Sequence, residues 1–380
     1  MTQYKQDGFA LPAALLAMVV IGAVVTGGFY AAGQEDRISA SSAGSREAFY
    51  MAEYGIEEVV GTQFRPWYQS IAIGSTATAS NAVMLNGDTA GVYDVTVRRL
   101  DDELYLITSE GGLPQRGYLA GRRQLAQVVK TENWDMPLSA ALYVYGGISV
   151  TGTAEVDGVD ADGGACNASG NSSVPGVISS DTSQVSTSGS GSIFGSPPVQ
   201  EDATLDSTSL LNYGDVDFDK LAAQATITFT SSQTLNGMGP VVSSGVCVTS
   251  NSLNWGDPEN PGQPCSSYYP IIYVNGDLNL QTGVGQGILL VEGDFRASGN
   301  FHFYGIVIVK GTLRTTGNGN HLNGVVIVNS GGIDLDSSAA AGISEVKYSS
   351  CSALNAMSGY QRAVPIETRS WYDATAAGGN

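Results

Sequence analysis

The feature that most constrains this chain is a run of 25 residues without a charge, from Phe9 to Gly33, behind a short polar segment. An α-helix needs about 20 such residues to cross the hydrocarbon core of a bilayer. A secretory signal peptide has a shorter apolar core, of about 7–15 residues, followed by small residues at its cleavage site. The run therefore predicts a membrane-spanning helix over residues 9–33, with the rest of the chain tethered to a membrane.

The residues that flank this run predict its orientation and its continuation. Lys5 precedes the span and Glu35-Asp36 follow it, so the bulk of the chain is predicted on the outer side of the membrane. Over residues 34–62, apolar and small side chains recur at steps of three or four. We therefore expect the helix to continue as an amphipathic one, with these residues on its buried face: Ile38, Ser42, Ser45, Phe49, Ala52, Ile56 and Val59.

The junction before the apolar run resembles that of type IV prepilins and pseudopilins, which have a short leader ending in Gly, an aromatic residue and then a helix. The matching residues are Lys5, Gly8, Phe9, Ala10, Leu11 and the apolar stretch through Val25. The segment Ala48–Glu57 is similar to the stretch that follows the span in PilX-type minor pilins, a family related to the K-type minor pseudopilin of type II secretion. The resemblance implies a leader of residues 1–8 and cleavage after Gly8 by a prepilin peptidase, with Phe9 as the methylated N-terminus. The alternative is an ordinary signal anchor.

Ala13 stands at the fifth position after this cut, where the family usually carries a Glu that neutralises the terminal amine of a neighbouring subunit. Its absence implies a minor subunit at or near the filament tip. The resemblance also implies four partners: other major and minor pilins contacted through the helix, the peptidase, the inner membrane, and a surface or adhesin. The implied location is a single-pass inner-membrane precursor with periplasmic bulk, and then the pilus fibre or the cell surface.

The composition is that of an exported, acidic protein. Among 380 residues there are 49 Gly, only 14% are charged, and the net charge is −19. Such a surface repels phosphate backbones, so we expect no nucleic-acid partner. The four cysteines, all after the span, predict two disulfides in an oxidising compartment, with three pairings open. They are Cys166, Cys247, Cys265 and Cys351.

Residues 63–135 predict a small antiparallel sheet. Residues 91–98 alternate apolar and polar side chains, Asp101-Asp102 suits a turn, and residues 103–109 return as a second strand before a third run at 122–130. The pilin resemblance implies that this sheet packs onto the helix, so residues 34–135 are predicted to form one compact module.

The C-terminal half contains a repeat of short β-branched runs, each followed by a turn that contains Gly. Its equivalent valines, Val274, Val291, Val309 and Val328, are 17, 18 and 19 residues apart. Such spacing predicts the coils of a β-solenoid over 136–150 and 271–348, with Ala141–Ile148 as its first rung and residues 151–270 as an insertion, partly loop. Residues 349–380 are predicted to be a tail. The fold class is therefore α+β, mainly β; an antiparallel sandwich is the alternative for the last domain.

Candidate chemistry in the second half is sparse. Asp157, Asp160 and Asp162 are weak calcium candidates, and a solvated turn is the simpler interpretation. If the solenoid were an enzyme, its carboxylates would be Asp277, Glu292 and Asp294, which also suit solvated corners. His302 and His321 are 19 residues apart, a spacing that would place both on one face of the solenoid. Two imidazoles are too few ligands for a zinc site. We expect no enzyme, no metal site and no cofactor beyond calcium.

These observations predict a minor pilin-like subunit of a type IV pilus that promotes assembly and presents an exposed β-rich domain. Two alternatives stay open. One is a minor pseudopilin of a type II secretion system, and the other is a membrane-anchored β-helix adhesin or polysaccharide-active protein that never enters a filament.

Overall fold

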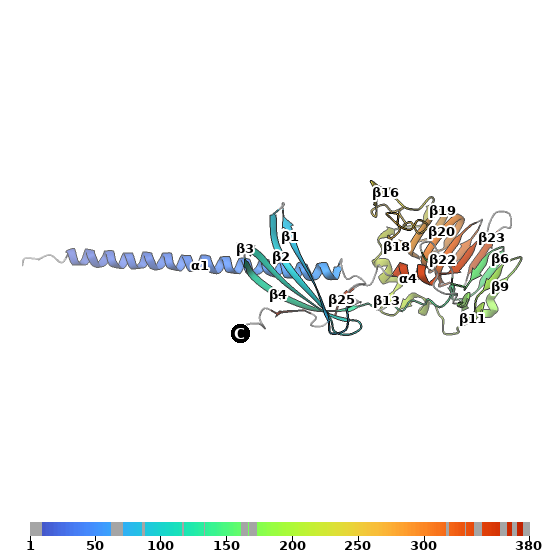
Figure 1. Cartoon of the computed structure of the whole chain (residues 1–380), viewed down its shortest axis with the longest axis horizontal. Coiled ribbons are helices and arrows are strands. Elements are labelled where there is room, and N and C mark those ends of the chain that lie inside the picture. The colour runs from blue at the N-terminus through green and yellow to red at the C-terminus, as the bar shows by residue number, and fades with distance from the viewer. Residues whose placement is uncertain are drawn as a thin grey trace, which may run out of the picture. The chain divides into compact units, whose positions relative to one another are not determined.

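The computed structural model describes residues 10–61, 71–85, 88–115, 118–132, 134–160, 166, 173–316, 319–330, 332–337, 344–357, 363–366 and 371–374. The chain divides into two compact units (Figure 1). The first comprises Met1–Thr131 and Arg362–Asn380, and the second comprises Glu132–Gln361. The fold is α+β and mainly β, as the sequence predicts.

The first unit begins with one helix, α1 (Ala10–Gly61), which joins the predicted span and its continuation without a break. From Ala14 to Ser42 its side chains are exposed, apart from the partly exposed Gln34. From Ala48 onward a stripe of small and aliphatic residues is buried, among them Ala52, Ile56 and Val59. Two residues that we expected on this stripe are not buried: Ile38 is 68% exposed, and Ser42 is exposed as well.

An antiparallel sheet packs against the second half of α1. Its strand order is β1-β2-β3-β4-β25, with β26 also paired to β4. The sheet's buried face carries Tyr93, Val95, Tyr105, Ile107 and Leu125, which alternate with outward residues along their strands. The strands are β1 (Thr76–Leu85), β2 (Asp88–Arg99), β3 (Leu104–Gln115), β4 (Tyr118–Thr131), β25 (Ala363–Pro365) and β26 (Trp371–Asp373).

Small residues let the helix approach the sheet closely. A Cβ added to Gly111 would meet the backbone carbonyl of Ala48 and the amide of Ala52, and one added to Gly55 would meet the Ser109 hydroxyl. Gly on both partners is therefore what permits this contact. The predicted tail, residues 349–380, contains structure that belongs to both units, because β25 and β26 complete this sheet and α4 (Ser350–Met357) belongs to the second unit.

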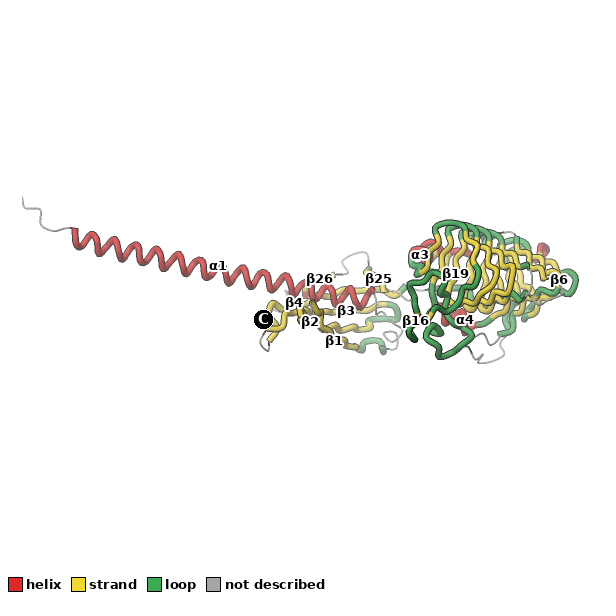
Figure 2. Tube along the Cα trace, turned by 90° about the horizontal axis from the view of Figure 1, so that it is seen from above, coloured by secondary structure: helices red, strands yellow, loops and turns green. Residues whose placement is uncertain are grey.

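The second unit is a parallel β-solenoid, which Figure 2 shows as a stack of coils. The pairing within its 16-stranded sheet is parallel, so the sandwich alternative is wrong. Each full coil contributes to three faces. The first face comprises β14 (Ile227–Phe229), β18 (Ile271–Val274), the ends of β19 (Leu278–Val291), β20 (Phe295–Val309) and β22 (His321–Val328), then β5 (Leu142–Val144), β8 (Val177–Ser179) and β11 (Val199–Glu201).

The other two faces continue the same coils. The second face comprises β15 (Gln233–Leu235), the starts of β19 and β20, β21 (Leu313–Thr315), β23 (Ile333–Ser337), β6 (Ile148–Gly152) and β9 (Val185–Thr187). The third face comprises the middles of β19 and β20, the start of β22, β24 (Glu345–Tyr348), β7 (Glu155–Asp157) and β10 (Ser192–Phe194).

The predicted valine repeat sets the register of the first face. Val274 pairs with Val291, Val291 with Val309, and Val309 with Val328. All four are fully buried. Each coil therefore stacks its apolar side chains on equivalent ones of the next, which buries a continuous core without any coil being stable alone.

The order of the coils differs from the prediction. Leu142–Val144 pairs with Val326–Val328, so the rung that comes first in the chain lies beyond the last repeat rung instead of before Ile272. The predicted insertion is in large part solenoid, because β7 to β11, β14 and β15 all join the same sheet. Their few apolar residues, such as Val177 and Ile227, are enough to fill the narrow interior.

Short elements complete the second unit between and beyond these coils. The helix α4 packs on β19, β20 and β22 at a corner formed by Gly287, Gly305 and Gly324, whose positive φ angles turn the strands there. The remaining elements are η1 (Thr182–Gln184), η2 (Ser209–Leu211), β12 (Asn212–Tyr213), β13 (Val216–Asp217), α3 (Phe218–Ala223), β16 (Val242–Ser243) and β17 (Val246–Cys247).

Candidate functional site

The exposed half of α1 is the largest candidate interaction surface of the first unit. It carries bulky apolar side chains such as Met18 and Phe29, which are 71% and 77% exposed. Within the described residues α1 is the one helix long and apolar enough to cross a membrane. An exposed apolar surface of this length could serve as a membrane anchor.

The predicted processing residues belong to the start of this helix. Gly8 and Phe9 lie outside the described residues. Ala13 lies in the first turns of α1. The cleavage site and the consequence of the missing Glu therefore stay predictions.

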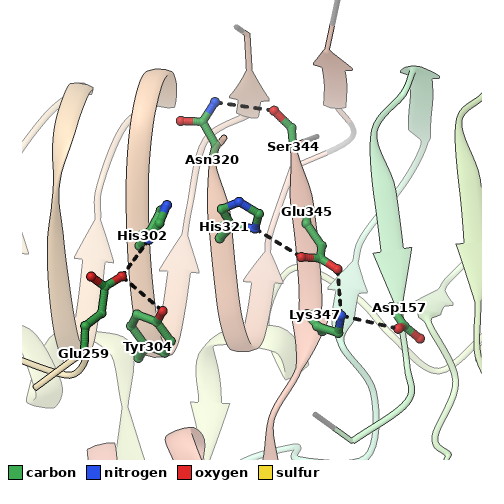
Figure 3. A network of polar contacts seen from close by, with 9 residues as sticks. All are labelled: Asp157, Glu259, His302, Tyr304, Asn320, His321, Ser344, Glu345 and Lys347. Carbon is green, nitrogen blue, oxygen red and sulfur yellow. Dashed lines mark hydrogen bonds and ion pairs between the residues drawn. The ribbon is translucent and has the colours of Figure 1, made fainter. Parts of the chain in front are cut away.

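On the third face of the solenoid, polar side chains of successive coils form a network (Figure 3). His302 and His321 pair in register, and their ring centroids lie 4.8 Å apart. Their common face agrees with the spacing of 19 residues. One side of the network extends to the loop that carries Glu259, and the other extends to β24 and β7.

Each histidine contacts a carboxylate. His302 Nδ1 lies 2.7 Å from Glu259 Oε1, which also accepts a hydrogen bond from the Tyr304 hydroxyl at 3.3 Å. Burial, reinforced by the Glu259 charge, raises the pKa of the Tyr304 hydroxyl well above its usual value. The Glu259 carboxylate thus ties its loop to β20.

The second histidine belongs to a chain of polar and charged side chains that runs across coils. His321 Nδ1 lies 3.1 Å from Glu345 Oε2, Lys347 Nζ lies 2.9 Å from Glu345 Oε1, and Lys347 Nζ lies 4.0 Å from Asp157 Oδ2. The hydrogen bond with His321 is the main cause that lowers the pKa of Glu345 to about 2, against the opposing effect of burial. Among the described residues, no three His, Cys, Asp or Glu side chains form a group that could hold a metal ion. The arrangement links coils by ion pairs.

Beside this network a hollow of about 530 Å³ lies between the third face and the loop after β15. It combines amide, hydroxyl, carboxylate and imidazole groups with a few apolar ones. The residues that define it here are Met238, Asn251, Glu259, Thr282, Asn300 and His302. Its lining therefore mixes hydrogen-bonding groups with apolar ones, as ligand pockets commonly do.

The predicted acidic corner residues have structural partners. Asp277 Oδ1 accepts a hydrogen bond from the Asp294 amide at 2.9 Å, and Asp294 Oδ1 accepts one from the Thr312 amide at 2.8 Å. Glu292 lies 2.8 Å from Lys310 Nζ and also accepts a hydrogen bond from the Tyr273 hydroxyl. Each carboxylate thus joins its own coil to a neighbouring one.

The weak calcium candidates are not brought together as a described cluster. Asp157 accepts a hydrogen bond from the Val159 amide at 2.9 Å. Asp160 is buried and accepts two hydrogen bonds from Ser350, at 3.0 Å from its amide and 2.7 Å from its hydroxyl. Asp162 lies outside the described residues. Calcium binding stays a prediction with no further support.

The four cysteines form two disulfides, which selects one of the three open pairings. Cys166 pairs with Cys351, 185 residues away, and Cys247 pairs with Cys265, 18 residues away. The second bridge closes the loop between β15 and β18.

Sequence reasoning missed Glu259, Tyr304, Glu345 and Lys347. Glu345 stands opposite His321 in the register, so extending the repeat one coil further would have found it. Glu259 comes from an irregular loop, and no periodic signal points to it.

The comparisons with known proteins show no family for this chain. No protein family matches the chain, and no curated protein matches it. Among solved structures, one similar to it is that of the competence-associated pilin ComZ from Thermus thermophilus. The two chains are 13% identical, with a TM-score of 0.25, and the likeness covers 87% of this chain and 97% of that one.

Proposed function

We propose that this chain is a minor pilin-like subunit of a type IV pilus, anchored in the inner membrane by α1 and carried into the fibre at or near its tip. The prepilin peptidase would cut after Gly8, and the apolar helix would pass from lipid to a bundle of like helices. A β-solenoid unit, without catalytic activity, would be presented to surfaces. The same parts would serve a minor pseudopilin of type II secretion.

The observation that carries this proposal is the difference in exposure between the two halves of α1. Its first half is exposed and apolar, and its second half is fixed to an antiparallel sheet through Ala48, Ala52 and Ile56. This arrangement suits a helix whose first half must exchange lipid for neighbouring helices while its second half stays packed on the sheet.

The solenoid unit is inserted in the chain between two paired strands of the first unit. Thr131, which ends β4, is the register partner of Ala363, which begins β25, and residues 132–361 form the solenoid unit between them. A domain inserted between paired neighbouring strands leaves the sheet intact. This supports separate roles, with assembly assigned to the first unit and surface contact to the second.

The first test is the N-terminal sequence and mass of the membrane-extracted protein, with and without the host's prepilin peptidase. A methylated Phe9 terminus that depends on the peptidase supports the proposal. An intact Met1, or a cut beyond Gly33, overturns it.

The second test replaces residues 132–362 by an Asn-Gly turn, which suits a two-residue hairpin between β4 and β25. We expect the shortened chain to enter the filament and to lose only its surface contacts. As a further check, Ala13→Glu should let the chain sit inside the shaft, and an unchanged position would contradict the tip assignment.

A second candidate function is that of a membrane-anchored saccharide-binding or polysaccharide-active protein. The hollow beside Glu259 and His302 favours it. Titration with neutral oligosaccharides tests it, with Asn300→Ala as the variant and Ser298→Ala as the control outside the hollow. Peptidase-independent anchoring together with Asn300-dependent saccharide binding would favour this candidate over the first.

A further inference from the structure

The solenoid is wound in two blocks that meet at a seam. The chain enters at β5–β7, winds through β8–β11, crosses over through residues 202–226 and resumes at β14. It then winds back through β18–β24 until β22, β23 and β24 pair with β5, β6 and β7. We call this boundary the seam, because it joins residues about 180 positions apart in the chain.

The seam has the same backbone pairing as other coil boundaries. The Val326 amide donates to the Ala141 carbonyl at 2.9 Å, and the Glu155 amide donates to the Ser344 carbonyl at 2.9 Å. Buried Val328 and Val144 stack across it. Neighbouring coils elsewhere follow each other along the chain, but here no short connection limits how far the two sides can separate.

Side chains reinforce the seam. The Tyr348 hydroxyl donates to the Leu138 carbonyl at 2.6 Å, Lys347 lies 4.0 Å from Asp157, and Ser350 donates twice to Asp160. Two of the residues considered for calcium, Asp157 and Asp160, therefore also make contacts across the seam.

The disulfide between Cys166 and Cys351 lies across this boundary. Cys166 follows β7 on one side, and Cys351 lies in α4, after β24, on the other. It therefore supplies the covalent link that the winding order lacks. The Cys247–Cys265 bridge stays within the loop between β15 and β18 and does not cross the seam.

We propose that Cys166–Cys351 is a redox latch on the seam. Two thiols form the bridge by thiol–disulfide exchange with an oxidised dithiol of the export compartment, which takes up two electrons and two protons and becomes a dithiol. In the reduced chain the seam opens, and residues 142–201 exchange as a separate cooperative unit while β18–β20 stay wound. Stacked repeats permit this, because each coil is stabilised by its neighbours alone.

Hydrogen exchange on the full chain in detergent tests this proposal. In the double variant Cys166→Ser/Cys351→Ser we expect amides of β5–β11 to exchange at least tenfold faster than in the wild type, with β18–β20 unchanged. The matched control, Cys247→Ser/Cys265→Ser, should change exchange only around residues 239–268.

A second measurement avoids dependence on folding without the bridge. The control variant, folded while oxidised, retains only the Cys166–Cys351 bridge, and dithiothreitol then reduces that bridge alone. Selective faster exchange in β5–β11 supports the latch. Unchanged exchange, or an equal increase over all coils, overturns it. Neither result depends on whether the protein enters a filament.

Discussion

The two units build their cores from different pairs of elements, and each has glycines where those elements approach closely. In the first unit, Gly111 and Gly55 bring a helix against a sheet, and the core between them is thin and one-sided. In the second unit, valine stacks on valine from coil to coil, and glycines such as Gly305 lie at a corner. The comparison shows that glycine lets a helix approach a sheet in the first unit and lets successive coils approach one another in the second, where the register of the stacked side chains forms the core.

The largest expected effect tests the stacked core of the solenoid. Phe303 is 1% exposed, pairs with Leu322 and lies against Phe301 and Trp255. Phe303→Ala should lower the free energy of unfolding by about 3–5 kcal/mol, since it leaves a cavity that rigid coils cannot close. Chemical denaturation of the second unit measures this. Phe194→Ala, at a site 48% exposed, is the matched control, and an equal loss there would contradict the stacking account.

The next effect tests the close approach in the first unit. Gly111→Ala adds a Cβ against the backbone of Ala48 and Ala52, which cannot move without shifting α1. We expect a loss of about 1–3 kcal/mol, the range for overpacked sites. Hydrogen exchange of β2–β4 measures it, and the solenoid should not respond.

The control for this substitution in β3 is Gly33→Ala, at a site on α1. Nothing lies within 4 Å of a Cβ added there. It should be neutral or stabilise the helix by up to about 1 kcal/mol. If Gly111→Ala, in strand β3, had as little effect as Gly33→Ala, close approach to α1 would not explain Gly111.

The third effect is the loss of stability at low pH, which we expect in the second unit because it contains Glu345. Glu345 has its pKa lowered to about 2, so its contribution is fully present above its usual pKa of 4.5 and is lost as the pH falls toward 2. We expect the solenoid to lose about 1–2 kcal/mol over this window, a value reduced for partial solvent exposure. Urea midpoints at pH 5 and pH 2.5 measure the loss.

Glu345→Gln isolates this contribution from its neighbours. The variant should remove that part of the pH dependence and leave the remainder. Burial, aided by the Glu345 and Asp157 charges, raises the pKa of Glu155, so Glu155 acts in the opposite direction and gains stability on protonation. If the pH dependence of stability were the same in the variant, the contacts with His321 and Lys347 would not stabilise the charged form of Glu345.

The sequence predicted what repeats and missed what does not. The spacing of Val274, Val291, Val309 and Val328 was enough to predict a solenoid and its register, because stacked coils place equivalent residues in contact. The winding order was not predictable, since nothing in residues 141–148 says which coil they neighbour. The partner of that rung depends on the crossover through residues 202–226, a tertiary choice.

The candidate site shows the same division. The common face of His302 and His321 follows from their spacing, but Glu259 comes from a loop without periodicity. The short strands β25 and β26 lack a pattern long enough to detect, and their place in the sheet depends on β4. The disulfide pairing likewise required the three-dimensional winding.

The smallest effect concerns the corners of the solenoid, where Asp294 either only caps a turn or also takes part in chemistry. Its carboxylate is exposed and accepts the Thr312 amide at 2.8 Å, while its own amide donates to Asp277. Asp294→Ala removes one acceptor that water can replace, so we expect a loss of about 0.5–1.5 kcal/mol by thermal unfolding. Asp294→Asn keeps an acceptor oxygen at the same place and should restore most of that stability. A structural cap requires this order of the two variants. If Asp294 instead took part in acid–base chemistry, both variants would be equally inactive toward a saccharide, whatever their stability. That result would show that the two units differ in chemical activity as well as in how they fold.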